Sequence, residues 1–218
     1  MSQVFKPSAN IIARMSIIGA VLLIGMALTM LILRNWSPYT INGNYAGIAV
    51  SQPVRFSHEL HSEQLNIGCM YCHATAEQSY YGGIPDVHTC MSCHSQLAIY
   101  SELLEPVRTS YATGDPVVWL GVHDLAEHVY FNHSVHVNNG FACHGPVNEM
   151  PQVWQHSNMY MGWCLECHFN PEEYIRPNET RYEFGYEYPE NQTEVGQELI
   201  EEYQVEVEGL SSCSTCHR

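Results

Sequence analysis

The cysteines of this chain stand in a repeated pattern with histidine. The pentapeptide C-x-x-C-H occurs four times, and each copy is typical of a covalent haem c attachment site. Two thiols at this spacing can bond the two vinyl groups on one edge of a porphyrin, while the adjacent histidine turns under the ring to bind the iron. The attachment cysteines are Cys69, Cys72, Cys90, Cys93, Cys164, Cys167, Cys213 and Cys216, and the iron-binding histidines are His73, His94, His168 and His217.

Other uses of cysteine fit this pattern less well. A C-x-x-C pair can be half of a zinc ribbon, but a ribbon needs no histidine after either pair, whereas all four pairs here have one. The chain has nine cysteines, an odd number, so a framework made only of disulfides would leave one thiol unpaired. The pattern therefore favours haem.

The region around the motifs contains an internal repeat. The segment F-S-H-E-L-H at 56–61 precedes the motifs that begin at 69 and 90, and F-N-H-S-V-H at 131–136 precedes G-F-A-C-H at 140 and the motif at 164. The offsets between the two copies are 75, 71 and 74 residues. We interpret 56–94 and 131–168 as two copies of one haem-binding unit.

The ninth cysteine, Cys143, keeps the last two residues of a motif. Taken alone, it would be read as a buried free cysteine beside an incidental histidine. The repeat instead places Gly140 where a cysteine is expected. We therefore predict a fifth haem c, held by one thioether through Cys143 and bound at its iron by His144.

Low-spin haems that transfer electrons need a second axial ligand, usually histidine or methionine. Each F-x-H-x-x-H segment places two histidines at i and i+3 of a short helix, where both side chains project from one side. The alternatives for these pairs are a plain surface helix or a zinc pair. The predicted distal histidines are His58, His61, His133 and His136.

One haem then still lacks a distal ligand. We predict Met150 for this place, although methionine at such positions is more often a packing residue. Met159 and Met161 lie close to Cys164, too near to reach the far side of that haem. The spare histidines also remain candidates: His88, His123, His128 and His156.

An uncharged stretch near the N-terminus predicts a membrane anchor. Residues 15–33 would form a helix of about 28 Å, close to the hydrocarbon thickness of a bilayer. Two basic residues precede the stretch and one follows it, which favours a cytoplasmic N-terminus and a haem domain on the periplasmic side of the inner membrane. A cleaved signal peptide is the alternative. It is disfavoured because the polar sequence that follows includes Trp36 and Tyr39, placed as interfacial anchors.

The remaining chain predicts a haem-packed domain of short helices and irregular loops with little sheet. Five haems would supply much of its apolar interior. The stretch 171–209 carries twelve glutamates and no haem motif, with a short helix expected at 194–206. It is either a solvated acidic spacer or a docking face for a basic carrier. The predicted parts are a cytoplasmic N-terminus at 1–14, an anchor at 15–34, a linker at 35–55, and a pentahaem domain at 56–218 that contains the acidic spacer and a terminal motif at 213–217.

The overall charge excludes one class of partner. The chain has 8 Lys and Arg against 23 Asp and Glu, a formal net charge of -15. Nucleic-acid binding needs a clustered positive surface, so no nucleic-acid partner is expected.

The order of motifs resembles the pentahaem cytochrome c subunit of bacterial alternative complex III, a multihaem cytochrome of the class III/c7 type. The likeness covers most of the chain and rests on F-K-P-S-A-N, S-P-Y, Q-P-V-R-F-S-H, P-V-R-T-S, V-Y-F-N-H-S-V-H, M-G-W-C-L-E-C-H and C-S-T-C-H-R together with the close motifs at 69 and 90. The chain departs from the family pattern at Gly140, where that pattern has cysteine.

This resemblance implies a subunit of a membrane quinol:electron-acceptor oxidoreductase. In such a complex an iron-sulfur subunit and integral membrane subunits would be partners. The acceptor would be a monohaem cytochrome, a small copper protein or an oxidase. The resemblance also implies four haems ligated by two histidines and one by histidine and methionine.

Two catalytic functions are alternatives to an electron-transfer subunit without its own active site. A multihaem reductase would need an iron with an exchangeable distal position and nearby acid-base groups, and no motif marks one. A stand-alone quinol dehydrogenase would need a quinol pocket built by the single helix and residues 34–55.

Overall fold

The computed structural model of the chain describes residues 7–35 and 46–217. The chain divides into two compact units between residues 44 and 45. The predicted interfacial anchors Trp36 and Tyr39 lie outside the described residues.

The first unit is built around helix α1, Pro7–Asn35. Residues Ser8–Leu33 are long and apolar enough to cross a membrane, with a mean hydropathy of 2.6 and none of the segment buried, although a signal sequence would meet the same criteria. The helix begins before the predicted anchor at 15–34, because residues 8–14 contain ordinary helix formers such as Ala and Arg. The helical segment is therefore longer than its most apolar part.

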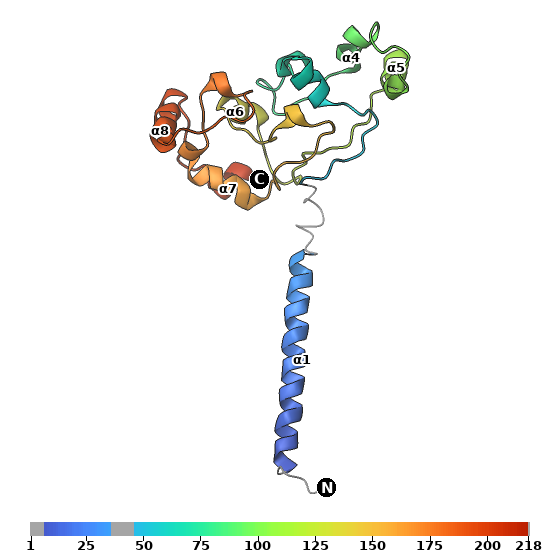
Figure 1. Cartoon of the computed structure of the whole chain (residues 1–218). Helices are drawn as coiled ribbons and strands as arrows, with labels where there is room; N and C mark the ends of the chain where they lie inside the picture. The colour runs from blue at the N-terminus through green and yellow to red at the C-terminus, as the bar shows by residue number, and fades with distance from the viewer. Residues whose placement is uncertain (1–6, 36–45, 218) are drawn as a thin grey trace. The chain divides into compact units, whose positions relative to one another are not determined.

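The second unit consists of short helices joined by irregular connections, as Figure 1 shows. Its described part contains no sheet, and its strand pairing is limited to three isolated bridges. The expectation of short helices with little sheet is confirmed. The helices are η1 (Glu59–Gln64), α3 (Cys69–Cys72), α4 (Val87–His94), η2 (Glu102–Leu104), α5 (Glu105–Thr113), α6 (His133–Asn138), η3 (Val147–Glu149), α7 (Met161–Phe169), η4 (Pro171–Glu173), η5 (Asn178–Thr180), α8 (Gln192–Glu202) and α9 (Cys213–Cys216).

Helix α8 is the helix expected in the acidic stretch, and it ends earlier than predicted. It packs so closely on η4 that a Cβ atom at Gly196 would collide with the backbone of Glu172. At its first residue, the Gln192 amide donates hydrogen bonds to the carbonyls of Glu172 and Ile175, at 2.9 and 2.8 Å. Helix α8 is thus tied to the beginning of the same acidic stretch, directly after α7.

The described residues of the second unit bury few apolar side chains. Its buried apolar residues are Val54, Ala76, Val107, Met150, Ile175 and Leu199. Large apolar side chains such as those of Tyr81, Ile84 and Tyr100 are exposed. The polypeptide therefore builds only a thin core of its own.

Candidate haem-binding sites

The motif cysteines lie on single turns of helix. Helices α3 and α9 each begin at the first cysteine of a motif and end at the second. The motif at 90 lies in α4, and the motif at 164 lies in α7. Because residues at i and i+3 of a helix project from the same side, this local structure directs both thiols of a motif toward one edge of a planar group.

Each histidine that ends a motif, including His144, lies opposite a second histidine. The distances between ring centroids are 6.3 Å for His58 and His73, 6.1 Å for His61 and His94, 6.2 Å for His133 and His144, 6.2 Å for His136 and His168, and 5.4 Å for His128 and His217. Two imidazoles that bind one metal from opposite sides, each at about 2 Å, have their centroids about 6 Å apart. In four of these pairs, a histidine of an F-x-H-x-x-H segment faces a histidine that follows an attachment cysteine. In the fifth pair, His217 faces His128, which the sequence analysis named only as a further candidate.

The backbone brings this fifth pair together. The Tyr130 amide donates a hydrogen bond of 2.8 Å to the Cys216 carbonyl, and Val129 forms an antiparallel bridge with His217. His128 is thereby fixed beside the terminal motif. Met150 is the residue that the sequence analysis preferred as this distal ligand. Its side chain is fully buried, and its backbone carbonyl accepts a hydrogen bond from the Glu59 amide at the start of η1.

Burial keeps several of the paired histidines neutral. It lowers the pKa of His144 to about 3, with smaller contributions from His123 and His133. It also lowers the pKa of His58 to about 4 and that of His136 below its usual value. Only a neutral imidazole can bind a metal, so these side chains are held in the form that coordination requires.

Contacts between motifs place the five histidine pairs in a spatial series that differs from their order in the sequence. The Tyr71 hydroxyl lies 2.8 Å from the Ser92 hydroxyl, which joins the first motif to the second. His133 Nδ1 donates a hydrogen bond of 3.0 Å to the Ala76 carbonyl, just after the first motif. The first motif is thus adjacent both to the second motif and to the histidine pair of the third site.

The rest of the series follows from helix α6 and the motif at 164. His133 and His136, three residues apart on α6, face His144 and His168 respectively. His168 Nδ1 donates a hydrogen bond of 2.9 Å to the Leu210 carbonyl, just before the terminal motif. Burial raises the pKa of Cys143 to about 12, and the neighbouring thiols of Cys167 and Cys164 add to this rise. Burial also raises the pKa of Cys164, with a further contribution from Cys216. The spatial series is therefore second motif, first motif, Cys143 site, motif at 164 and terminal motif.

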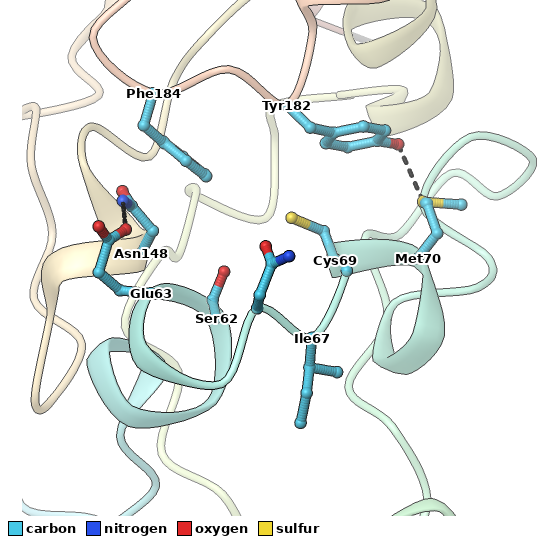
Figure 2. Close-up of a pocket in the computed structure, with 10 residues that line it drawn as sticks. Ser62, Glu63, Ile67, Cys69, Met70, Asn148, Tyr182 and Phe184 are labelled. Carbon is cyan, nitrogen blue, oxygen red and sulfur yellow. Dashed lines mark hydrogen bonds between the residues drawn. The ribbon is translucent and has the colours of Figure 1, made fainter.

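A cavity of about 390 Å³ opens beside the first motif. Figure 2 shows the Cys69 sulfur directed into this space, which Phe184 and Tyr182 also line. The Tyr182 hydroxyl lies 2.9 Å from both the Met70 sulfur and the Glu77 carboxylate. The Cys69 thiol is thus accessible from this cavity.

The structure gives a physical reason for glycine at position 140. Gly140 has a φ of +74°, and a Cβ atom there would lie 2.5 Å from the Arg176 carbonyl oxygen. The buried Arg176 guanidinium donates a hydrogen bond of 2.7 Å to the Gly140 carbonyl. A cysteine would require the backbone of this segment to move, so the site has room for the Cys143 thiol alone.

The zinc alternative receives no support from the geometry. Among the described residues, no three or more His, Cys, Asp and Glu side chains gather in a group that could hold a metal ion. A structural zinc site needs four protein ligands, whereas the histidines here come together as opposed pairs.

Comparison with known proteins identifies the family. No protein-family profile matches the chain. A relative from Nitratidesulfovibrio vulgaris, the multihaem cytochrome c subunit of a menaquinone reductase, is 33% identical over 143 residues, which cover 55% of this chain and 68% of that protein. The chain belongs to the multihaem cytochromes c. This confirms the class predicted from the motifs, and the cytochrome binds haem c covalently, as its family does.

Proposed function

We propose that this cytochrome carries five haems c and relays electrons as a subunit of a membrane complex of the alternative complex III type. The observation that carries the proposal is that all five histidines next to a candidate attachment cysteine face a second imidazole, with ring centroids 5.4–6.3 Å apart. When bound, haem c supplies an iron that takes up and releases one electron. We assign His128, in place of Met150, as the distal ligand opposite His217.

The residues of the chain would hold and insulate these groups. The motif cysteines would attach each haem covalently, and the paired imidazoles would bind its iron and leave no position for a small molecule. The thin core of the polypeptide supports this role, because a domain with so few buried apolar side chains needs another apolar component. The spatial series of motifs supplies a continuous path between the second motif and the terminal motif.

The proposed partners are those of a quinone-linked membrane complex. An iron-sulfur subunit and integral membrane subunits would stand on one side of the path. A monohaem cytochrome, a small copper protein or an oxidase would be the acceptor on the other. Helix α1 would anchor the cytochrome in the lipid of the inner membrane, with its N-terminus in the cytoplasm and the haem domain in the periplasm. The name of the relative, a subunit of a menaquinone reductase, supports the link to quinone.

That name also favours a second candidate function, a relay in the opposite direction, toward quinone. The complex purified in mild detergent separates the two. If the relay leads outward, a reduced quinol analogue will reduce the haems rapidly and an added monohaem cytochrome will reoxidise them. If it leads toward quinone, a reduced periplasmic carrier will reduce the haems and quinone will reoxidise them.

The catalytic alternatives make different predictions. A reductase needs an exchangeable distal position, and each candidate iron-binding histidine of the described chain faces a second imidazole. A stand-alone quinol dehydrogenase would be isolated without partner subunits and would still oxidise quinol.

Intact-mass spectrometry and electron paramagnetic resonance test the proposal. We expect the mass of the polypeptide plus five haems, five low-spin ferric signals and no change on adding cyanide. A mass with four haems would remove the Cys143 site, and a high-spin signal that responds to cyanide would favour an enzyme.

A further inference from the structure

Four of the five candidate proximal histidines are oriented by a backbone carbonyl. Their Nδ1 atoms lie close to the carbonyl oxygens of Gly83, Leu97, Leu210 and His128, at 2.9, 3.1, 2.9 and 3.2 Å for His73, His94, His168 and His217 respectively. A carbonyl can only accept a hydrogen bond, so each Nδ1 carries the proton. The Nε2 lone pair is left free to bind iron.

His144 is the exception. Its Nδ1 lies 3.3 Å from Nε2 of His123, and the two rings meet edge to face at 86° with their centroids 4.3 Å apart. If Nε2 of His144 binds iron, its Nδ1 must carry the proton and donate it to His123. The half-buried His123 then accepts through Nε2 and keeps its own proton on Nδ1.

Resting on the proposed function, we infer that His123 is a positioning residue that orients His144 and tunes the electron-donating strength of this one ligand. A hydrogen bond from the outer nitrogen of a ligand histidine fixes its ring and raises its basicity. An imidazole nitrogen is a stronger acceptor than an amide carbonyl, so His144 acquires more negative character than the other four proximal ligands. The oxidised haem at this site is thereby stabilised, and its reduction potential is lowered.

The geometry distinguishes this role from that of a distal ligand. The ring of His133 lies 6.2 Å from that of His144, a separation that leaves room for an iron between them. The ring of His123 lies too close for an intervening metal and approaches the nitrogen that does not face the iron. The site also has one attachment cysteine instead of two, so the orientation of His144 depends more strongly on its hydrogen bond.

The test is a redox titration of the full-length, haem-loaded protein in mild detergent, followed by electron paramagnetic resonance. In His123→Leu we expect five haems by mass and a rise in one midpoint potential. The ratio of reduced to oxidised haem at that site should increase roughly tenfold at fixed potential, or about 59 mV for one electron. The other four potentials should not move.

Two further variants and a ¹⁵N NMR measurement test whether the effect comes from the hydrogen bond between His123 and His144. His123→Gln, whose amide carbonyl can accept the same hydrogen bond but is a weaker acceptor than imidazole, should restore the potential only in part. His88→Leu is the matched control, because His88 packs on Tyr111 at 5.0 Å and should leave every potential unchanged. If His123→Leu does not mature, reduced wild-type protein labelled with ¹⁵N-histidine should show a coupling across one hydrogen bond between two imidazole nitrogens.

Several results would overturn the inference. Unchanged potentials in His123→Leu with five haems present, or the absence of the nitrogen–nitrogen coupling, would show that His123 does not tune the site. A new high-spin signal in His123→Leu would make it a distal ligand. A wild-type mass with four haems would instead refute the fifth haem of the proposed function, and the inference with it.

Discussion

The two F-x-H-x-x-H segments support their second histidine in the same way on different kinds of helix. Phe56 stacks on His61 with the ring centroids 4.4 Å apart, and Phe131 stacks on His136 at 4.3 Å. In both copies Nδ1 of the second histidine donates a hydrogen bond of 2.8 Å to the carbonyl four residues earlier. Yet the first segment continues into the π-helix η1 and the second into the α-helix α6. The aromatic stack and the carbonyl therefore fix the position of this histidine, rather than the type of helix.

The first histidine of each segment differs between the copies. His133 Nδ1 donates to the Ala76 carbonyl, and the His133 amide donates to the Tyr80 carbonyl, both in the turn after the first motif. His58 Nδ1 is buried and has no hydrogen-bond partner among the described residues. The second copy is thus docked on the first, and the repeat is a packed pair rather than two independent units.

The largest expected effect is the loss of a haem when an attachment cysteine is removed from the second copy of the repeat but not when one is removed from the first. Cys143→Ala removes the single proposed thioether of its site, so we expect the mass to fall by one haem. Cys69→Ala leaves Cys72 in the same motif, so all five haems should remain. Mass spectrometry of both variants checks this. Retention of five haems in Cys143→Ala would mean that Cys143 is not an attachment residue.

The terminal motif lies outside the repeat and needs a separate test of its distal ligand. His128→Ala should convert one low-spin signal to high spin, because it removes the imidazole opposite His217. Met150→Leu nearly conserves side-chain volume, so it should keep all five low-spin signals and cost less than about 1.5 kcal/mol of unfolding free energy. A high-spin signal in Met150→Leu would reverse the assignment.

The sequence predicts what depends on local spacing and leaves open what depends on contacts between distant residues. The motifs and the four histidines of the two F-x-H-x-x-H segments follow from spacings of a few residues, so they could be named in advance. His128 is fixed beside His217 through backbone pairing across 89 residues, and no local pattern distinguishes it from His88 or His156. The contact of His123 with His144 is likewise a product of the fold, as is the need for glycine at position 140.

A smaller effect is expected at Gly140, the place where the second copy loses a cysteine. Gly140→Cys should add no second thioether and should lower the unfolding free energy by about 1–3 kcal/mol, because a side chain at positive φ meets the Arg176 carbonyl. Gly68→Ala is the matched control, since no neighbouring atom lies within 4 Å of a Cβ atom there. Denaturant unfolding and haem count measure both. A stable Gly140→Cys protein with an extra thioether would contradict the steric explanation.

The smallest expected effect concerns the stacked phenylalanines. Phe56→Leu and Phe131→Leu should each keep five haems and lose about 0.5–1.5 kcal/mol of unfolding free energy. The loss should be greater for Phe56, which also contacts His58 edge-on at 4.8 Å, whereas Phe131 and His133 are 6.4 Å apart. Denaturant titrations compare the two, and a greater loss for Phe131 would show that docking on the first copy matters more than the stack.

The half-buried Cys143 thiol has a consequence for the biogenesis of the cytochrome. Thiolates are the reactive form of cysteine, and burial raises the pKa of this thiol to about 12. Once the chain has folded, the half-buried thiol is therefore protonated at physiological pH. Under the proposed function, attachment of the fifth haem at Cys143 therefore precedes the folding of this segment.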